Sequence, residues 1–124
     1  KNHIIRAALE SIAFQVFDVL DSISTDLDFP ISSLRVDGGA TVNNFLMQFQ
    51  ADLLQIKIDR PKNIESTAMG AGMLAGLGVG FWRDTSELIA VRNSDRIFIQ
   101  TMDDKTRKTL LQAWKISIRK TQTY

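Results

Sequence analysis

Two consecutive glycines between a strand-like and a helix-like segment limit the fold of this 124-residue chain more than any other feature. Residues 33–37 read as a short strand and run directly into "DGGA". Residues 41–54 then carry apolar side chains at helical spacing, namely Phe45, Leu46, Phe49, Leu53 and Leu54. The chain must either make a tight turn there or let another molecule approach its backbone.

Helical and strand-like periods alternate along the rest of the chain. Residues 3–21 have a helical period with Asn2 as a plausible N-cap, and residues 55–59 alternate like a strand. A helix starting near residues 65–67 runs through "AMGAGMLAGLGVG", and further helices are predicted over "DTSELIAVR" and residues 103–121, with an edge strand at "DRIFIQ". The predicted apolar stripe of the first helix is Ile5, Leu9, Ile12, Val16 and Leu20, widened by Ala8, Ala13 and Phe17. This order predicts an α/β fold with a parallel or mixed sheet covered by helices.

The helix at "GAGMLAGLG" is rich in small residues. Gly70, Gly72 and Gly76 each weaken a helix by roughly 1 kcal/mol relative to alanine, which is tolerated where a neighbour must come very close. We therefore expect this helix to pack tightly on the sheet. The larger apolar side chains expected in the core rather than at a cofactor are Met47, Met69, Met73, Trp82 and Trp114.

Composition excludes several function classes. A net charge of +1 argues against a nucleic-acid partner, and the absence of cysteine together with a single histidine excludes disulfide scaffolds and cysteine or multi-histidine metal sites. The absence of cysteine also fits a cytoplasmic location. No apolar run reaches the roughly 20 residues of a membrane helix, so no membrane partner is expected. Because the chain begins at Lys1 with a helical pattern, we expect it to be part of a longer protein.

The glycine turn has a structural and a functional interpretation. In α/β folds ligands bind beyond the carboxyl ends of strands, and glycines with free N–H groups at a helix start suit a phosphate. Asn43 could hydrogen-bond a base or a ribose. The sequence contains neither GxxxxGK[ST] nor GxGxxG here, so the pair of glycines alone favours a plain turn. Asp37 either acts through water on a metal–phosphate group or holds the turn by an Asx-type bond, and the second is favoured.

Several longer motifs together resemble one known family. "NHIIRAALESIAFQVFDVL", "LRVDGGATVNNFLMQFQADLL", "DRP" and "ESTAMGAGMLAGLGVGFW" occur in one order from about Asn2 to Trp82, and the resemblance is looser beyond. They resemble the C-terminal domain of the FGGY carbohydrate kinases, with "VDGGA..NNFLMQFQ" and "GFW" typical of its glycerol kinase branch. The resemblance implies a ribonuclease H-like, actin-type ATPase fold of two domains with ATP between them. Residues 1–124 would form the C-terminal nucleotide-binding domain.

The resemblance also implies roles for single residues. Gly39 would lie near the ATP phosphates and Asn43 would reach the adenine side, with Gly38 and Ala40 as neighbours in the same turn. The catalytic aspartate, the glycerol-binding residues and the first phosphate loop belong mainly to an N-terminal domain that this chain does not contain. No catalytic or metal-binding residue is therefore assigned. The expected cofactors are ATP and Mg²⁺, and a homo-oligomer is compatible with the family.

Three functions follow as hypotheses. The first is one part of an ATP-dependent glycerol kinase that forms glycerol 3-phosphate and is inactive on its own. The second is another FGGY kinase that acts on xylulose or gluconate, because its nucleotide-binding side would look alike. The third is a non-catalytic α/β binding module whose glycines are purely structural.

Overall fold

A computed structural model describes residues 1–91 and 93–122 and confirms the predicted α/β class. The elements are α1 (Asn2–Asp26), β1 (Ser33–Arg35), the 3₁₀-helix η1 (Gly39–Val42), α2 (Asn44–Leu54), β2 (Lys57–Pro61), α3 (Ser66–Gly78), α4 (Thr85–Val91), β3 (Ser94–Phe98) and α5 (Asp104–Gln122). Arg92, the last residue of the predicted "DTSELIAVR" helix, lies outside the described residues.

The sheet is small and mixed, which is one of the two kinds, parallel or mixed, that the order of elements predicted. Its strand order is β1-β2-β3, so β3 is an edge strand, as expected. β1 pairs in parallel with β2, and β2 pairs antiparallel with β3. Ile58 of the central strand is fully buried, and it lies opposite Leu34 on one side and Phe98 on the other.

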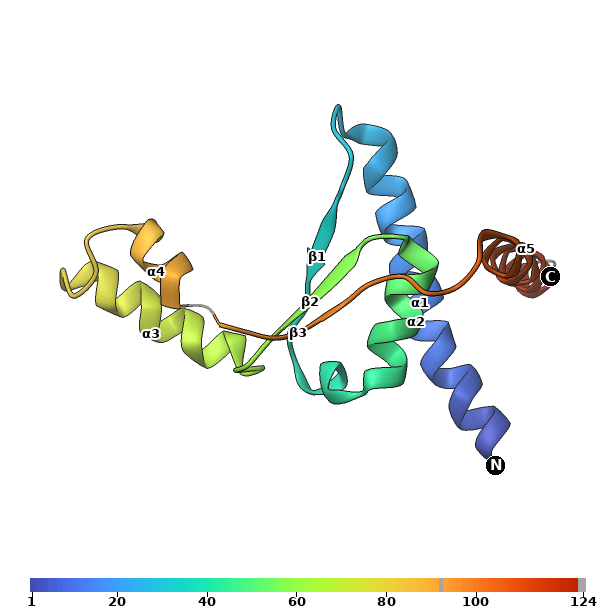
Figure 1. Cartoon of the computed structure of the whole chain (residues 1–124), viewed down its shortest axis with the longest axis horizontal. Coiled ribbons are helices and arrows are strands. Elements are labelled where there is room, and N and C mark those ends of the chain that lie inside the picture. Colours follow the sequence, from blue (N-terminus) through green and yellow to red (C-terminus); the bar gives the residue numbers. More distant parts are fainter. Residues whose placement is uncertain (92, 123–124) are drawn as a thin grey trace.

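The core lies where α1 and α2 pack together beside the sheet (Figure 1). The stripe predicted for α1 is partly wrong, because Ile5 and Ile12 are 61% and 42% exposed whereas Phe14 is buried. Apolar residues surround most of this helix, so periodicity alone does not decide which side faces inward. Tertiary contacts decide it: Phe14 meets Phe49 edge-on and stacks on Trp114.

Polar contacts attach α5 to the core. Asp52 of α2 is buried, and its carboxylate accepts hydrogen bonds from the N–H groups of Thr101 (2.6 Å) and Met102 (3.1 Å) just before α5. The Trp114 indole N–H donates to Asp18 of α1 at 2.8 Å. These bonds satisfy polar groups that would otherwise be costly to bury.

The helix ends differ in how they are capped. Lys1, not Asn2, is the N-cap of α1, and no side chain caps it, so the prediction for Asn2 was wrong. Asp103 precedes α5 and accepts from the N–H of Thr106 at 2.9 Å. Hydrogen bonds from the side chain and backbone of Thr106 lower the pKa of the Asp103 carboxyl.

No described helix is both long and apolar enough to cross a membrane.

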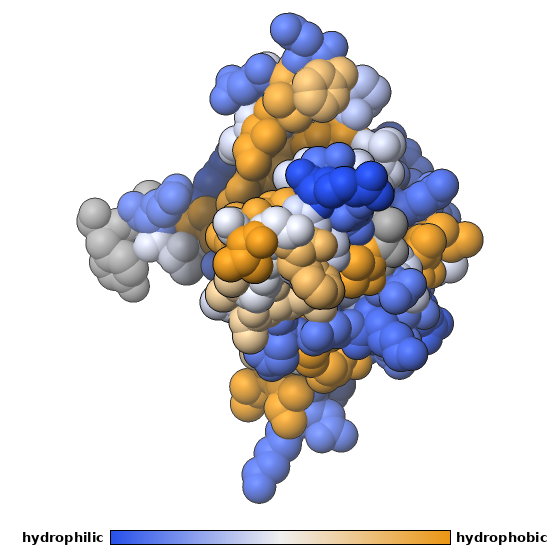
Figure 2. All heavy atoms as spheres, turned by 90° about the vertical axis from the view of Figure 1, so that its left-hand side faces the viewer, coloured by the Kyte–Doolittle hydropathy of each residue, from blue (hydrophilic) through white to orange (hydrophobic). Residues whose placement is uncertain are grey.

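The expected tight packing of α3 on the sheet is wrong for the described residues. With α4, this helix extends beyond the end of β2, away from the sheet, and none of its side chains is buried (Figure 1). A methyl group at Gly70 or Gly72 would meet open space, whereas one at Gly76 would overlap the ring of Trp82. Figure 2 shows the side of the molecule that carries α3 and α4, with apolar and polar surface interspersed.

The expected core residues divide accordingly. Met47 is buried, and Trp114 is half-buried against the core. Met69 and Met73 instead line a cavity beside α3, and Trp82 is half-buried against Gly76. The prediction was thus right for Met47 and Trp114 and wrong for Met69, Met73 and Trp82, because α3 and the residues that follow it lie outside the core.

Candidate functional site

The turn after β1 has a shape that requires glycine at one position. Gly38 has φ +83°, in the left-handed region that glycine adopts most easily. Its N–H donates to the Ile64 carbonyl at 3.0 Å, so this group is already used. The N–H and the hydroxyl of Thr41 both donate back to the Gly38 carbonyl, at 3.1 and 2.7 Å. The turn is therefore closed by its own hydrogen bonds.

The next two residues carry the exposed donors of the turn. Gly39 and Ala40 begin η1, and no described residue accepts a hydrogen bond from either N–H. A Cβ at Gly39 would meet nothing within 4 Å, and its φ lies outside the left-handed region. No neighbour within the described part of the chain therefore requires glycine at 39. An incoming group with acceptor oxygens would find two backbone donors and no side chain in the way at Gly39.

Asn43 ends the same turn and starts α2. Its Oδ1 accepts from the Leu46 N–H at 3.1 Å, which makes it the N-cap, and its own N–H donates to the Ala40 carbonyl at 3.2 Å. No described residue accepts a hydrogen bond from its side-chain NH₂ group. The four residues predicted from the sequence therefore lie in one continuous turn, and among the described residues the Asn43 NH₂ group and the N–H groups of Gly39 and Ala40 have no acceptor.

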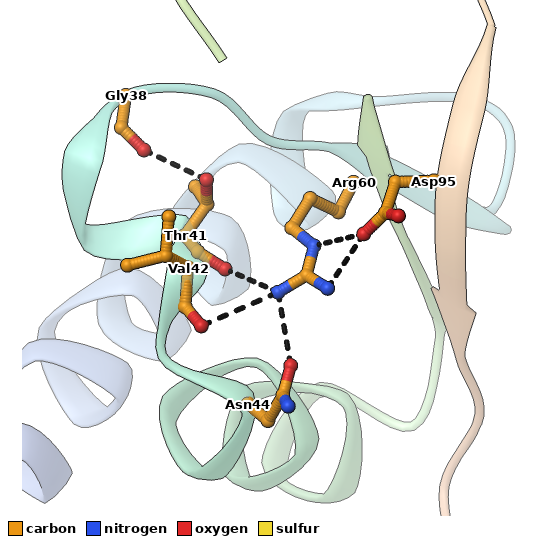
Figure 3. A network of polar contacts seen from close by, with 6 residues as sticks. All are labelled: Gly38, Thr41, Val42, Asn44, Arg60 and Asp95. Atoms are coloured by element: carbon orange, nitrogen blue, oxygen red, sulfur yellow. Dashed lines mark hydrogen bonds and ion pairs between the residues drawn. The ribbon is translucent and has the colours of Figure 1, made fainter. Parts of the chain in front are cut away.

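The side chain of Arg60, on β2, holds this turn by hydrogen bonds that were not predicted from the sequence (Figure 3). Nη1 of Arg60 donates to the carbonyls of Thr41 (2.9 Å) and Val42 (3.4 Å) and to Asn44 Oδ1 (2.9 Å). Its Nε and Nη2 donate to the same carboxylate oxygen of Asp95, at 2.9 and 2.6 Å. The sequence signal was only the "DRP" motif, which does not say what the arginine contacts.

Asp37 joins two elements and does not make the expected Asx-type bond. Its carboxylate accepts a hydrogen bond from the hydroxyl of Ser66, the first residue of α3. Sequence reasoning failed here because its partner lies beyond β2 in the chain. The contact ties the end of β1 to the start of α3.

A cavity of about 680 Å³ lies beside this contact. Asp37, Ser66, Met69, Met73 and Ile89 are among its lining residues, but Gly38, Gly39, Ala40 and Asn43 are not. The predicted turn and this cavity are thus neighbouring but different surfaces.

Among the described residues, no three histidine or acidic side chains gather where a metal ion could be held.

Comparison with known proteins identifies the family. Residues 1–79 match the C-terminal domain of the FGGY family of carbohydrate kinases. The glycerol kinase of Shewanella frigidimarina is 52% identical over 118 residues, which cover 95% of this chain and 24% of that enzyme. The chain therefore spans about a quarter of the length of this relative.

Solved structures agree with this result. The crystal structure of Plasmodium falciparum glycerol kinase with ADP matches with a TM-score of 0.85 and 40% identity, over 98% of this chain and 24% of that one. A xylulose kinase from Lactobacillus acidophilus matches with a TM-score of 0.76 over 98% of this chain and 25% of that one, and at 21% identity it shows the fold alone. The chain belongs to the FGGY family of carbohydrate kinases, and residues 1–79 correspond to that family's C-terminal domain.

Proposed function

We propose that residues 1–124 are the C-terminal nucleotide-binding part of an ATP-dependent glycerol kinase, which forms glycerol 3-phosphate. The observation that carries this proposal is the turn at Gly38–Asn43, where the N–H groups of Gly39 and Ala40 have no acceptor among the described residues and no described neighbour requires glycine at 39. The high identity to a glycerol kinase supports glycerol as the substrate. The rest of the enzyme would supply the catalytic base and the glycerol site.

Each residue of the turn has its own role in this proposal. The N–H groups of Gly39 and Ala40 donate to phosphate oxygens, and the NH₂ group of Asn43 donates to the base or ribose. Gly38 gives the turn its shape. ATP supplies the transferred phosphoryl group, and phosphoryl transfer depends mostly on positioning and charge stabilisation.

Mg²⁺ belongs to the proposed reaction, and no three histidine or acidic side chains gather around a possible metal position among the described residues. In such sites Mg²⁺ is bound largely through substrate phosphates and one or two carboxylates. We assign its protein ligands to the rest of the enzyme. We also propose that the enzyme is cytoplasmic and has no nucleic-acid or membrane partner. Assembly of the enzyme into a homo-oligomer is compatible with this proposal.

Asn43 offers the first test of the nucleotide site. Asn43→Ser in the intact enzyme keeps a side-chain oxygen for the helix cap but removes the NH₂ donor. We expect the KM for ATP to rise about tenfold, as for one lost hydrogen bond, and the KM for glycerol to stay within twofold. Steady-state kinetics with each substrate varied in turn measures both.

Asn43→Ala is the matched control for the cap. It should show the same rise in the KM for ATP and also lose about 1 kcal/mol of stability with the cap. If the KM for ATP is unchanged in both variants, Asn43 does not contact the nucleotide.

A substrate panel tests the activity itself. ADP production by the intact enzyme is measured with glycerol, xylulose and gluconate in turn. Turnover with glycerol alone supports the proposal. Turnover with a sugar instead keeps the nucleotide site and replaces the substrate, and no turnover with any of them favours a non-catalytic binding module.

A further inference from the structure

We propose that Arg60 is a positioning residue for ATP, because its guanidinium fixes the turn that carries Gly39 and Asn43. The inference rests on the proposed function, since it concerns the same nucleotide site. The inference adds Arg60 to this site, although Arg60 lies on β2 and not within the turn at residues 38–43.

The contacts of Arg60 lie on either side of Asn43. One guanidinium nitrogen, Nη1, donates to the carbonyls of Thr41 and Val42, which come just before Asn43, and to the side chain of Asn44, which comes just after it (Figure 3). Carbonyls at the end of a short helix have no partner within the helix and need one elsewhere. Arg60 supplies that partner, and it thereby fixes the backbone just before Asn43 and the side chain just after it.

The guanidinium is itself held by the sheet. Asp95 of β3 accepts from Nε at 2.9 Å and from Nη2 at 2.6 Å, and the group lies over the Phe98 ring at 5.3 Å. The Arg60 side chain is only 12% exposed, so its charge needs the carboxylate. The turn is thus connected through one planar group to two hydrogen-bonded strands.

Arg60 acts on the turn and not on the ligand. All three guanidinium nitrogens are engaged by the turn or by Asp95. Its effect on ATP must therefore pass through the geometry of residues 39–43. A misplacement of about 1 Å in such a site can lower the rate about a hundredfold.

The test replaces Arg60 in the intact kinase. Arg60→Lys keeps the charge but loses the fork of donors, and we expect the KM for ATP to rise about tenfold. Arg60→Ala should raise it further and lower kcat/KM for ATP about a hundredfold. The KM for glycerol should stay within twofold in both variants. Because a general structural defect would affect both substrates, this split separates positioning from stability.

Arg96→Lys is the matched control. Arg96 lies opposite Arg60 in the β2–β3 ladder, and its guanidinium covers the same Phe98 ring at 4.7 Å. Within the described part of the chain it donates no hydrogen bond to the turn. We therefore expect both KM values of Arg96→Lys to equal those of the parent enzyme.

Two further measurements complete the test. Millimolar guanidinium ion should restore part of the ATP affinity of Arg60→Ala and have no such effect on the parent. Asp95→Asn weakens the support of Arg60 and should raise the KM for ATP about threefold, and it serves together with Arg60→Lys if Arg60→Ala does not fold. A KM for ATP within twofold of the parent in Arg60→Lys and Asp95→Asn overturns the inference.

The outcome also separates this inference from the proposed function. Calorimetric titration with ADP is applied to the Asn43→Ser variant and to the Arg60 variants. If Asn43→Ser weakens ADP binding and the Arg60 variants do not, only the positioning role is wrong. If none of them changes ADP binding, the nucleotide site itself is wrong.

Discussion

Replacing Gly39 by alanine is expected to lower the affinity of the intact kinase for ATP about a hundredfold while leaving its stability nearly unchanged. The fold accepts a methyl group at this position, since a Cβ there meets nothing within 4 Å and φ lies outside the left-handed region. A phosphate held by the N–H groups of Gly39 and Ala40 would have to approach the same place. The methyl group therefore disturbs the ligand and not the protein.

Gly38→Ala is the control with the opposite pattern. With φ +83° at Gly38, an alanine there should lower the free energy of unfolding by about 1–2 kcal/mol. Calorimetric titration with ADP measures affinity, and thermal unfolding without ligand measures stability. A second readout is the rise in Tm on adding ADP, which reflects affinity and should nearly vanish for Gly39→Ala. ADP binding by Gly39→Ala within twofold of the parent would contradict the phosphate contact.

The local parts of the fold were predictable from the sequence. The turn at "DGGA" and the helix after it depend on backbone conformation and on apolar spacing, which are local properties. The side of α1 that faces the core could not be predicted in this way. It is set by the packing of Phe14 against Phe49 and Trp114, which lie far along the chain. Small residues indicate only that a close approach is tolerated, so the position of α3 away from the sheet could not be predicted either.

The candidate site divides in the same way. Gly38, Gly39, Ala40 and Asn43 were predicted, and they lie in one continuous turn. Arg60 was not predicted as a site residue. Its contacts with the turn and with Asp95 form only because β2 lies between the turn and β3 in the folded chain. A charged residue in a strand does not by itself reveal its partners. The residues proposed to contact the nucleotide could be predicted from the local sequence, whereas the residue proposed to hold them in place depends on tertiary structure.

Phe98→Ala is expected to lower the free energy of unfolding by about 3–5 kcal/mol, more than any other substitution proposed above. Phe98 is 2% exposed and lies opposite Ile58 of the central strand, so its removal leaves a cavity inside the core. Hydrogen exchange of the β2 amides in the intact enzyme, followed by mass spectrometry, measures the local stability of this sheet. If these amides open through unfolding of the domain, their exchange should become faster by about two to four powers of ten.

Phe98→Leu separates burial from the ring itself. Leucine keeps most of the buried apolar volume, so the loss should be smaller, about 1–2 kcal/mol. It removes the aromatic face that lies beneath Arg60 and Arg96, at 5.3 and 4.7 Å. Because Arg60 holds the turn, this variant should still raise the KM for ATP by about two- to threefold, as expected for roughly 0.5 kcal/mol. Equal KM values for Phe98→Leu and the parent would show that Asp95 alone suffices to hold the guanidinium in place.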